Sequence, residues 1–190
     1  MKGRRLPPEP LTRQEVEALL RRCSRRAPTG FRNRALIAVL YRGGLRISEA
    51  LALRLDDLDA ETGAVRVLHG KGDRARTIGL DAGAFALVDA WVDCRRRIGL
   101  DRTAPLFCTL AGRRLHASYV RQLLPRLARK AGIGKRVHPH GLRHTHATEL
   151  AAENVSLLDI QTQLGHAHLD NRALRAPAPA RAHDREDARA

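Results

Sequence analysis

Apolar residues recur along most of the chain at the three- and four-residue intervals of amphipathic helices. Thr12 and Glu15 have the spacing of a capping box and predict the start of the first helix. Asp81 and Ser118 stand where the N-caps of two later helices are expected, and Gly132 stands where the second of these ends. Helices are predicted at about 12–23, 31–42, 47–53, 82–98, 119–132, 138–153 and 157–164.

The apolar period changes from helical to alternating between residues 64 and 80. Residues 64–68 and 76–80 are predicted to be two strands of a hairpin, because a Gly-Lys-Gly-Asp turn sequence lies between them. Lys71 is therefore expected near the hairpin tip. Two further apolar residues, Ile98 and Leu157, are assigned to buried helix faces. The pattern predicts a mainly α fold with one small antiparallel β-sheet.

The chain is expected to contain one domain. Residues 1–11 are interpreted as a linker and residues 12–170 as the domain. Residues 171–190 are rich in Ala, Arg, Pro and acidic residues, and they are expected to be a disordered tail. No apolar run has the length of a membrane span, and the basic N-terminus lacks the apolar region of a signal peptide. A cytoplasmic location is predicted.

The charge of the chain is strongly positive. The formal net charge is +15 at pH 7, and such a charge favours nucleic acid as a partner. The cysteines, Cys23, Cys94 and Cys108, do not have the spacing of a zinc site or a disulfide framework. We therefore expect neither a structural metal nor a disulfide.

Several cationic side chains stand at predicted helix ends, where an anion could bind. His140 and Arg143 are three residues apart on one helix and share a face. Arg46 follows Gly43-Gly44, where the backbone can approach closely, and His166 follows a helix-ending glycine. Cleavage of a phosphodiester spreads negative charge over non-bridging oxygens, which a planar guanidinium can contact in pairs. These residues are candidates for a phosphate site.

Several segments together resemble the motifs of the tyrosine recombinases, the phage-integrase family. They occur in the family's order between about residues 11 and 170. The segments are Tyr41–Glu49 (first arginine box), Gly70–Gly72 (lysine hairpin), His140–His144 (H-x-L-R-H box) and Leu164–His166 (L-G-H box). The resemblance implies a mostly α catalytic domain with a small sheet. It also implies DNA integration and recombination through a 3′-phosphotyrosyl intermediate, with no metal, ATP or other cofactor.

The resemblance implies a role for each matching residue. Arg46 and Arg143 would hold the scissile phosphate. His140 and His166 would donate hydrogen bonds to it or transfer protons, and Lys71 would act as the general acid.

A supporting residue and the partners are implied as well. Glu49 would support the site by ordering Arg46 or His140. The partner would be double-stranded DNA, which places the protein on the bacterial nucleoid. No membrane and no small-molecule cofactor are implied.

The chain departs from the family pattern at the nucleophile. The family's tyrosine follows the L-G-H box, and the corresponding position here is Arg175. The chain's tyrosines are Tyr41 and Tyr119; core packing is the favoured interpretation of Tyr41, and neither is expected to replace the nucleophile. The change of composition at about residue 170 suggests a frameshift or a degraded gene end. Reading the other two frames of the downstream DNA tests this hypothesis.

Relatives usually carry an N-terminal DNA-clamping domain, and only residues 1–11 precede the first predicted helix here. Together with the missing tyrosine, this suggests a cleavage-inactive remnant. Relatives normally dock a C-terminal helix onto a neighbour, and because that segment is lost here, we expect a monomer in solution. One alternative is an active site completed by a tyrosine from a full-length recombinase. Another is a DNA-binding module that modulates recombination sites without cleavage.

Two further alternatives concern other classes of protein. A helix-turn-helix regulator would explain the charge but not the lysine hairpin or the L-G-H box. A metal site is suggested by the closely spaced histidines, but the H-E-x-x-H pattern is absent, so no metal is expected. The histidines in question are His138, His140, His144 and His146.

Overall fold

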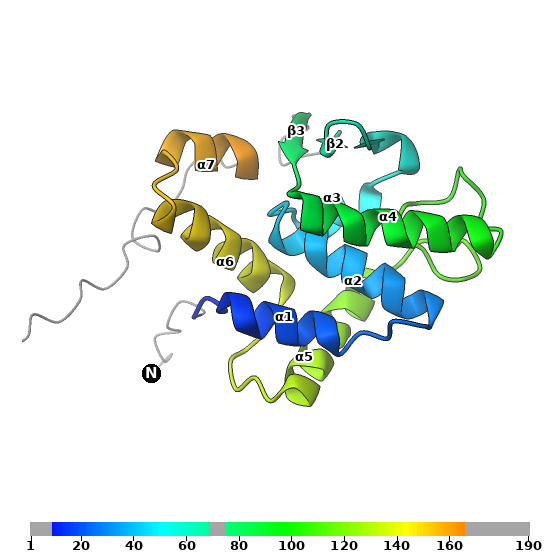
Figure 1. Cartoon of the computed structure of the whole chain (residues 1–190), viewed down its shortest axis with the longest axis horizontal. Helices are drawn as coiled ribbons and strands as arrows, with labels where there is room; N and C mark the ends of the chain where they lie inside the picture. The colour runs from blue at the N-terminus through cyan, green and yellow to red at the C-terminus, as the bar shows by residue number, and fades with distance from the viewer. Residues whose placement is uncertain (1–8, 69–74, 166–190) are drawn as a thin grey trace, which may run out of the picture.

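The computed structural model describes residues 9–68 and 75–165 (Figure 1). The described part is mostly helical with one small antiparallel sheet, which confirms the predicted fold class. The helices are α1 (Arg13–Arg21), α2 (Pro28–Tyr41), α3 (Ile47–Ala52), α4 (Ala82–Arg97), α5 (Ala117–Ala131), α6 (Pro139–Ala152) and α7 (Leu157–Leu164). The remaining elements are the 3-10 turn η1 (Leu55–Asp57) and the strands β1 (Leu58–Asp59), β2 (Ala64–Val67) and β3 (Arg76–Gly79).

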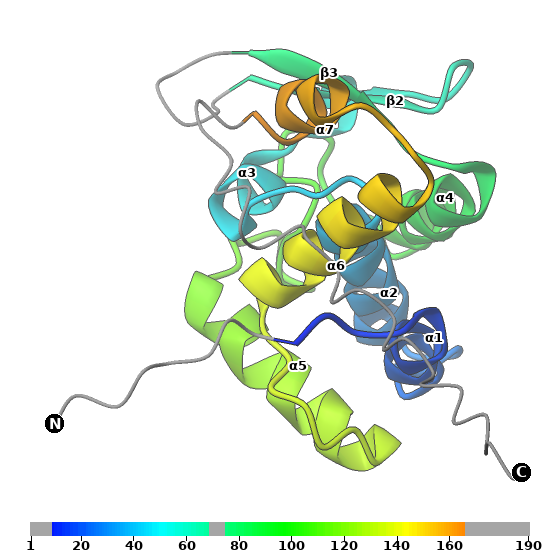
Figure 2. The same cartoon turned by 90° about the vertical axis from the view of Figure 1, so that its left-hand side faces the viewer.

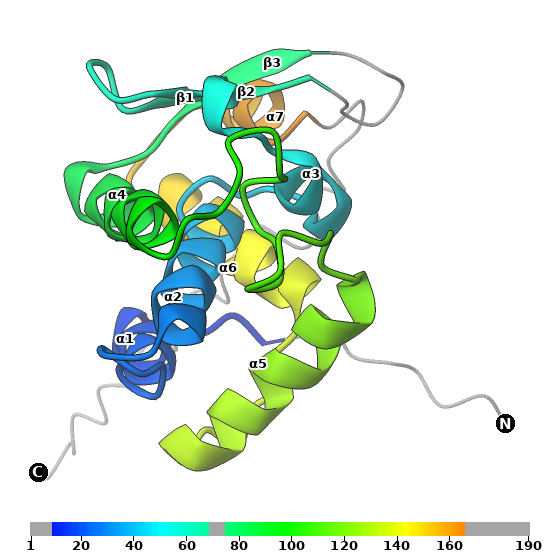
Figure 3. The ribbon, with the colours of Figure 1, turned by 90° about the vertical axis from the view of Figure 1, so that its right-hand side faces the viewer.

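Helix α2 is the central helix of the fold, and α4 lies along it (Figures 1 and 3). Most of α2 is buried on all sides, as expected for a helix that other helices surround. It begins at Pro28 and not at the predicted residue 31, because proline fits the first helical position. On α4, the predicted N-cap Asp81 accepts from the amide of Ala84, and Trp91 is fully buried.

Helices α1 and α5 contact each other at the opposite end of the molecule from the sheet (Figure 3). The capping box of α1 is confirmed: the Glu15 amide donates to Thr12 Oγ1 at 3.2 Å, and the Thr12 amide donates to Glu15 Oε2 at 2.7 Å. The predicted cap of α5 at Ser118 is wrong. The helix begins at Ala117 after His116, so Ser118 already lies in its first turn. The predicted stop at Gly132 is confirmed by a φ of +74°.

The sheet has the strand order β1-β2-β3 with antiparallel pairs throughout. Val65 faces Ile78 and Val67 faces Arg76, so these four side chains lie on one surface of the sheet. Both valines and Ile78 are buried. Strand β1 was absent from the sequence prediction because its two residues are too few to show a period.

Helix α7 joins the fold through a small apolar cluster that is separate from the main core. Ile160 and Leu164 of α7 pack there against Ala147 of α6. The assignment of Leu157 to this buried face is wrong, because Leu157 is the first residue of α7 and is 45% exposed. Ile98 was likewise assigned to a buried face, but it follows the last turn of α4 and is 39% exposed.

Replacing Thr12 by alanine should lower the free energy of unfolding by about 1 kcal/mol, because the N-cap hydrogen bond to the Glu15 amide is lost. Urea unfolding followed by circular dichroism measures the change. Thr162→Ala is the control, since Thr162 is an exposed threonine inside α7 and caps no helix. Equal losses in the two variants would contradict a capping role for Thr12.

Candidate phosphate-binding site

Three arginines that are far apart in the sequence meet around one buried carboxylate, that of Glu49. Arg46 immediately precedes α3, Arg76 begins β3 and Arg143 lies on α6. The Glu49 side chain is only 1% exposed. A carboxylate so buried requires cationic partners, and here several converge on it.

Glu49 receives hydrogen bonds on both carboxylate oxygens. Arg46 donates from its backbone amide to Oε2 at 2.8 Å and from Nη1 to Oε1 at 2.7 Å. Arg76 donates from Nη2 to Oε2 at 2.8 Å and from Nη1 to Oε1 at 3.2 Å. Burial alone would raise the pKa of Glu49, but the hydrogen bonds from Arg76 and Arg46 outweigh it and lower the pKa to about 2. Glu49 is therefore ionised at neutral pH.

Arg143 is almost completely buried, with a side chain that is 3% exposed. Its Nη1 donates to the carbonyl oxygen of Gly44 and lies 4.0 Å from Glu49 Oε2, and its Nη2 donates to the carbonyl oxygen of Leu164 at 2.6 Å. Burial, and next the charge of Arg46, lower the pKa of Arg143 to about 10. It keeps its charge at neutral pH.

His140 lies beside the two arginines to which the sequence analysis assigned the phosphate. Partial burial lowers the pKa of its imidazole, and the charges of Arg143 and Arg46 lower it further. The ring also stacks on that of His138, with centroids 6.3 Å apart. Because His140 is an exposed residue, its imidazole remains accessible at the edge of the arginine cluster.

Arg76 belongs to this cluster, although the sequence analysis did not select it. Its Nε donates to the carbonyl oxygen of Gln163 at 3.0 Å, and its side chain is 11% exposed. The signal that could have revealed it is its strand register. Arg76 pairs with the buried Val67, so its side chain lies on the inner face of the sheet.

The remaining predicted site residues lie outside the described residues. These are Lys71, His166 and the position expected for the nucleophile, Arg175. The described residues stop at residue 68 before the lysine hairpin and begin again at residue 75, and Gly165 is the last described residue before His166. Their roles stay predictions.

Both tyrosines are held by hydrogen bonds within the fold. Tyr41 is 7% exposed, and its hydroxyl donates to the Glu149 carboxylate, with oxygen distances of 2.5 and 2.7 Å. Burial and Glu149 raise the pKa of Tyr41 well above its usual range. The Tyr119 hydroxyl accepts from Arg32 at 2.7 Å and is hydrogen-bonded to Asn33. Both hydroxyls are therefore engaged in hydrogen bonds within the fold.

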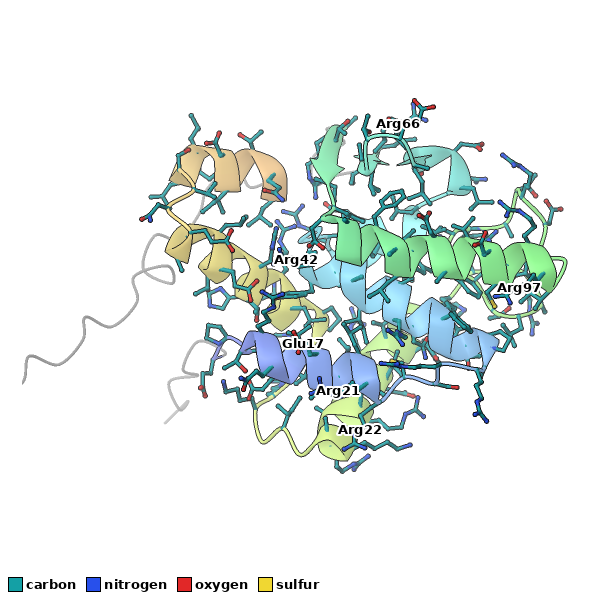
Figure 4. The ribbon with its side chains drawn as sticks, in the orientation of Figure 1. Glu17, Arg21, Arg22, Arg42, Arg66 and Arg97 are labelled. Atoms are coloured by element: carbon teal, nitrogen blue, oxygen red, sulfur yellow. The ribbon has the colours of Figure 1, made fainter. Side chains whose placement is uncertain are left out.

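A second ion-pair network lies behind the site. Arg42 donates from Nε to Asp81 Oδ2 at 2.5 Å and from Nη1 to Glu149 Oε2 at 3.2 Å. These bonds join the end of α2 to the start of α4 and to α6. Figure 4 shows Arg42 between these elements.

Over the described ranges, no group of three or more His, Cys, Asp or Glu side chains is placed to hold a metal ion. None of the described helices is long and apolar enough to cross a membrane.

The mostly helical fold with one small antiparallel sheet is that of the catalytic domains of recombinases. The profile described as the Phage integrase family matches residues 9–172. The chain therefore belongs to the phage integrase family and has the fold of the tyrosine recombinase catalytic domain. This confirms the resemblance stated from the sequence motifs.

The relatives support the same assignment. Tyrosine recombinase XerC of Escherichia coli O127:H6 is 37% identical over 142 residues, which are 75% of this chain and 47% of XerC. XerH bound to palindromic difH substrate is similar in structure, with a TM-score of 0.72, 32% identity and coverage of 87% of this chain and 48% of XerH. XerA recombinase has a TM-score of 0.76 at 29% identity, covering 92% of this chain and 64% of XerA. The chain spans about half the length of the curated relatives it matches.

His146 should make the domain sensitive to mild acid. It is 3% exposed, and burial, followed by the charges of Arg42 and Arg143, lowers its pKa from 6.5 to about 4. The unfolded chain therefore binds a proton between pH 6.5 and 4 that the folded chain does not, so stability falls as the pH falls through this range. His146→Phe should remove about 2 kcal/mol of this loss between pH 7.5 and 5.

Urea unfolding of both proteins at the two pH values tests the role of His146. Phenylalanine fills a similar volume without a titrating group. The control is His116→Phe, because His116 is an exposed residue that only precedes α5. The same pH dependence in wild type and His146→Phe would contradict the prediction.

Proposed function

We propose that this chain binds double-stranded DNA as the catalytic domain of a site-specific tyrosine recombinase, and that it holds one phosphodiester at the cluster of Arg46, Arg143 and His140. The observation that carries the proposal is the charge balance around Glu49. Arg46, Arg76 and Arg143 supply three positive charges against one carboxylate. The excess positive charge favours an anion with several oxygens, and a DNA phosphate is such an anion.

Within this site, Arg46 is the guanidinium best placed for the phosphate. Its side chain is 24% exposed, and it is oriented by Glu49 from behind. Arg143 adds charge from a buried position, and His140 offers an imidazole N–H at the edge. We further propose that Lys71 is the general acid and that His166 is a second imidazole donor. The reaction implied by the family uses neither metal nor ATP.

Cleavage of DNA by this chain alone is not part of the proposal. Arg175 stands at the nucleophile position, and the hydroxyls of Tyr41 and Tyr119 are engaged in the fold. We propose that covalent chemistry needs a tyrosine from a full-length recombinase acting at the same site. The second candidate function is a DNA-binding modulator of recombination sites that does not cleave DNA. Arg175 at the nucleophile position and the engaged hydroxyls of Tyr41 and Tyr119 favour it as well. For either role we propose that the protein is cytoplasmic and associated with the bacterial nucleoid through DNA. We also propose that residues 12–170 form the DNA-binding domain.

DNA binding is tested by charge-neutralising variants. Arg46→Gln should weaken binding to a duplex about tenfold or more, because charge-assisted hydrogen bonds to phosphate are lost. The wild-type affinity should also fall steeply as the salt concentration rises. Fluorescence anisotropy with labelled duplex measures both effects. Arg97→Gln is the control, because Arg97 is an exposed residue at the far end of α4 (Figure 4). An equal loss of duplex affinity in the two variants would show that binding depends only on the overall positive charge, and it would contradict a phosphate site at Arg46.

Covalent chemistry is tested on suicide substrates, which trap a protein–DNA adduct. The chain alone should form no adduct. Added to a full-length recombinase of the XerC type, it should either form mixed complexes in which only the partner is attached to DNA, or reduce the partner's cleavage. An adduct on this chain would overturn the proposal that it lacks an attacking group.

A further inference from the structure

The C-terminal end of α7 is held by the same arginines that surround Glu49. The carbonyl groups of Gln163 and Leu164, and that of the C-cap residue Gly165, each accept a hydrogen bond from a different guanidinium. The donors are Arg76 Nε at 3.0 Å, Arg143 Nη2 at 2.6 Å and Arg46 Nη2 at 3.1 Å, respectively. These arginines come from β3, α6 and the residue before α3.

Such contacts suit the electrostatics of a helix end. The last carbonyls of a helix lack partners within the helix and carry the negative end of its dipole, so cations there are stabilising. Helix α7 needs this support, because it is short and joins the fold through a small apolar cluster. Figures 1 and 2 show α7 beside β3, at the sheet end of the molecule.

Within the described residues, all three side-chain nitrogens of Arg76 donate hydrogen bonds to protein groups. Its Nη groups both donate to Glu49, and its Nε donates to the Gln163 carbonyl. A Cβ placed on Gly165 would lie 3.1 Å from Arg76 Nη1, so the glycine backbone lies directly against the guanidinium. Arg76 is thus turned toward protein groups and not toward a ligand.

We propose that Arg76 is a positioning residue, which fixes Arg46 through Glu49 and fixes the end of α7 through Gln163. One planar guanidinium joins the first arginine box to the segment that leads into the L-G-H box. The expected effect of Arg76 on DNA affinity rests on the proposed function. The positioning itself does not, since it concerns contacts within the protein.

The arrangement requires the shape of arginine as well as its charge. The fork presents two Nη donors to the two oxygens of Glu49 while Nε points to Gln163. A lysine ammonium at this position supplies the charge but cannot make all three contacts. Arg76→Lys should therefore recover only part of what Arg76→Gln loses.

Three measurements on the full chain test the proposal. In Arg76→Gln, amide hydrogen exchange in residues 157–165 should accelerate at least about tenfold relative to that in α2. The pKa of the Glu49 carboxyl, followed by carbon NMR, should rise by at least about one pH unit. Duplex affinity should fall by about tenfold. Arg76→Lys should give intermediate values.

Arg66→Gln is the matched control, because Arg66 lies on the neighbouring strand β2, is exposed and points away from the site (Figure 4). It should leave α7 exchange and the Glu49 pKa unchanged. If Arg76→Gln behaves like Arg66→Gln, the proposal is overturned. If Arg76→Gln does not fold, Arg76→Lys decides by the same measurements. If wild type binds no DNA, the proposed function fails, while exchange and the Glu49 pKa still judge the positioning role.

Discussion

Glu49→Gln is expected to lower the free energy of unfolding by about 3 kcal/mol at pH 7. The substitution keeps the size of the side chain but removes the negative charge on which Arg46 and Arg76 converge. An amide also turns a donor toward guanidinium groups that can only donate. Positive charges buried without their counter-ion repel each other, and the folded state loses most from this.

The stabilisation by the Glu49 carboxylate should also depend on pH. The pKa of Glu49 is about 2 in the folded protein against 4.5 for the free group. A carboxyl with a lowered pKa stabilises the fold above its unfolded pKa, and this contribution is lost as the pH falls from about 4.5 to 2. Wild type should therefore lose stability over that interval, whereas Glu49→Gln should lack this contribution. The difference in free energy of unfolding between wild type and Glu49→Gln should therefore become smaller from pH 7 to pH 3, and urea unfolding measures it.

An added anion should partly replace the missing carboxylate. Inorganic phosphate binds the folded state of Glu49→Gln through the unpaired guanidiniums and raises its stability by mass action. The melting temperature of the variant should rise more with phosphate than that of wild type. Asp93→Asn is the control, because Asp93 is an exposed carboxylate that pairs only with Arg96 in the described residues. Equal stability of Glu49→Gln and wild type would contradict the buried charge cluster.

The sequence could reveal the residues whose neighbours form recognisable local patterns. Arg46 and Glu49 are three residues apart at a helix start, so their contact follows from helix geometry. His140 and Arg143 are spaced in the same way on α6. The capping box at Thr12 and the stop at Gly132 are also local, and the structure confirms both.

Contacts between distant segments could not be predicted in this way. The bond from Arg76 to Gln163 joins residues 87 positions apart, and no local period encodes it. The burial of Arg143 was also missed, because a helical face shows which residues align but not what covers them. The wrong cap at Ser118 has a different cause, since a local pattern fixes the end of a helix only to within one or two residues.

Gly44→Ala is expected to lower the free energy of unfolding by about 2–5 kcal/mol and to displace α7 from the arginines. Gly44 has a φ of +59°, which an alanine adopts at a cost of about 1–2 kcal/mol. The added Cβ would also lie 2.4 Å from Leu164 Cδ2 and 2.9 Å from His146 Cδ2. Relieving this overlap costs about 1–3 kcal/mol more, because both side chains are buried.

The matched control is Gly99→Ala, which separates backbone strain from crowding. Gly99 has a φ of +70°, but no atom lies within 4 Å of a Cβ placed there. It should therefore show only the strain of about 1–2 kcal/mol. Because Leu164 carries the carbonyl that Arg143 contacts, Gly44→Ala should also accelerate amide exchange at the end of α7, whereas Gly99→Ala should not. Equal losses of stability, with unchanged exchange in α7, would show that Gly44 does not set the distance between the first arginine box and α7.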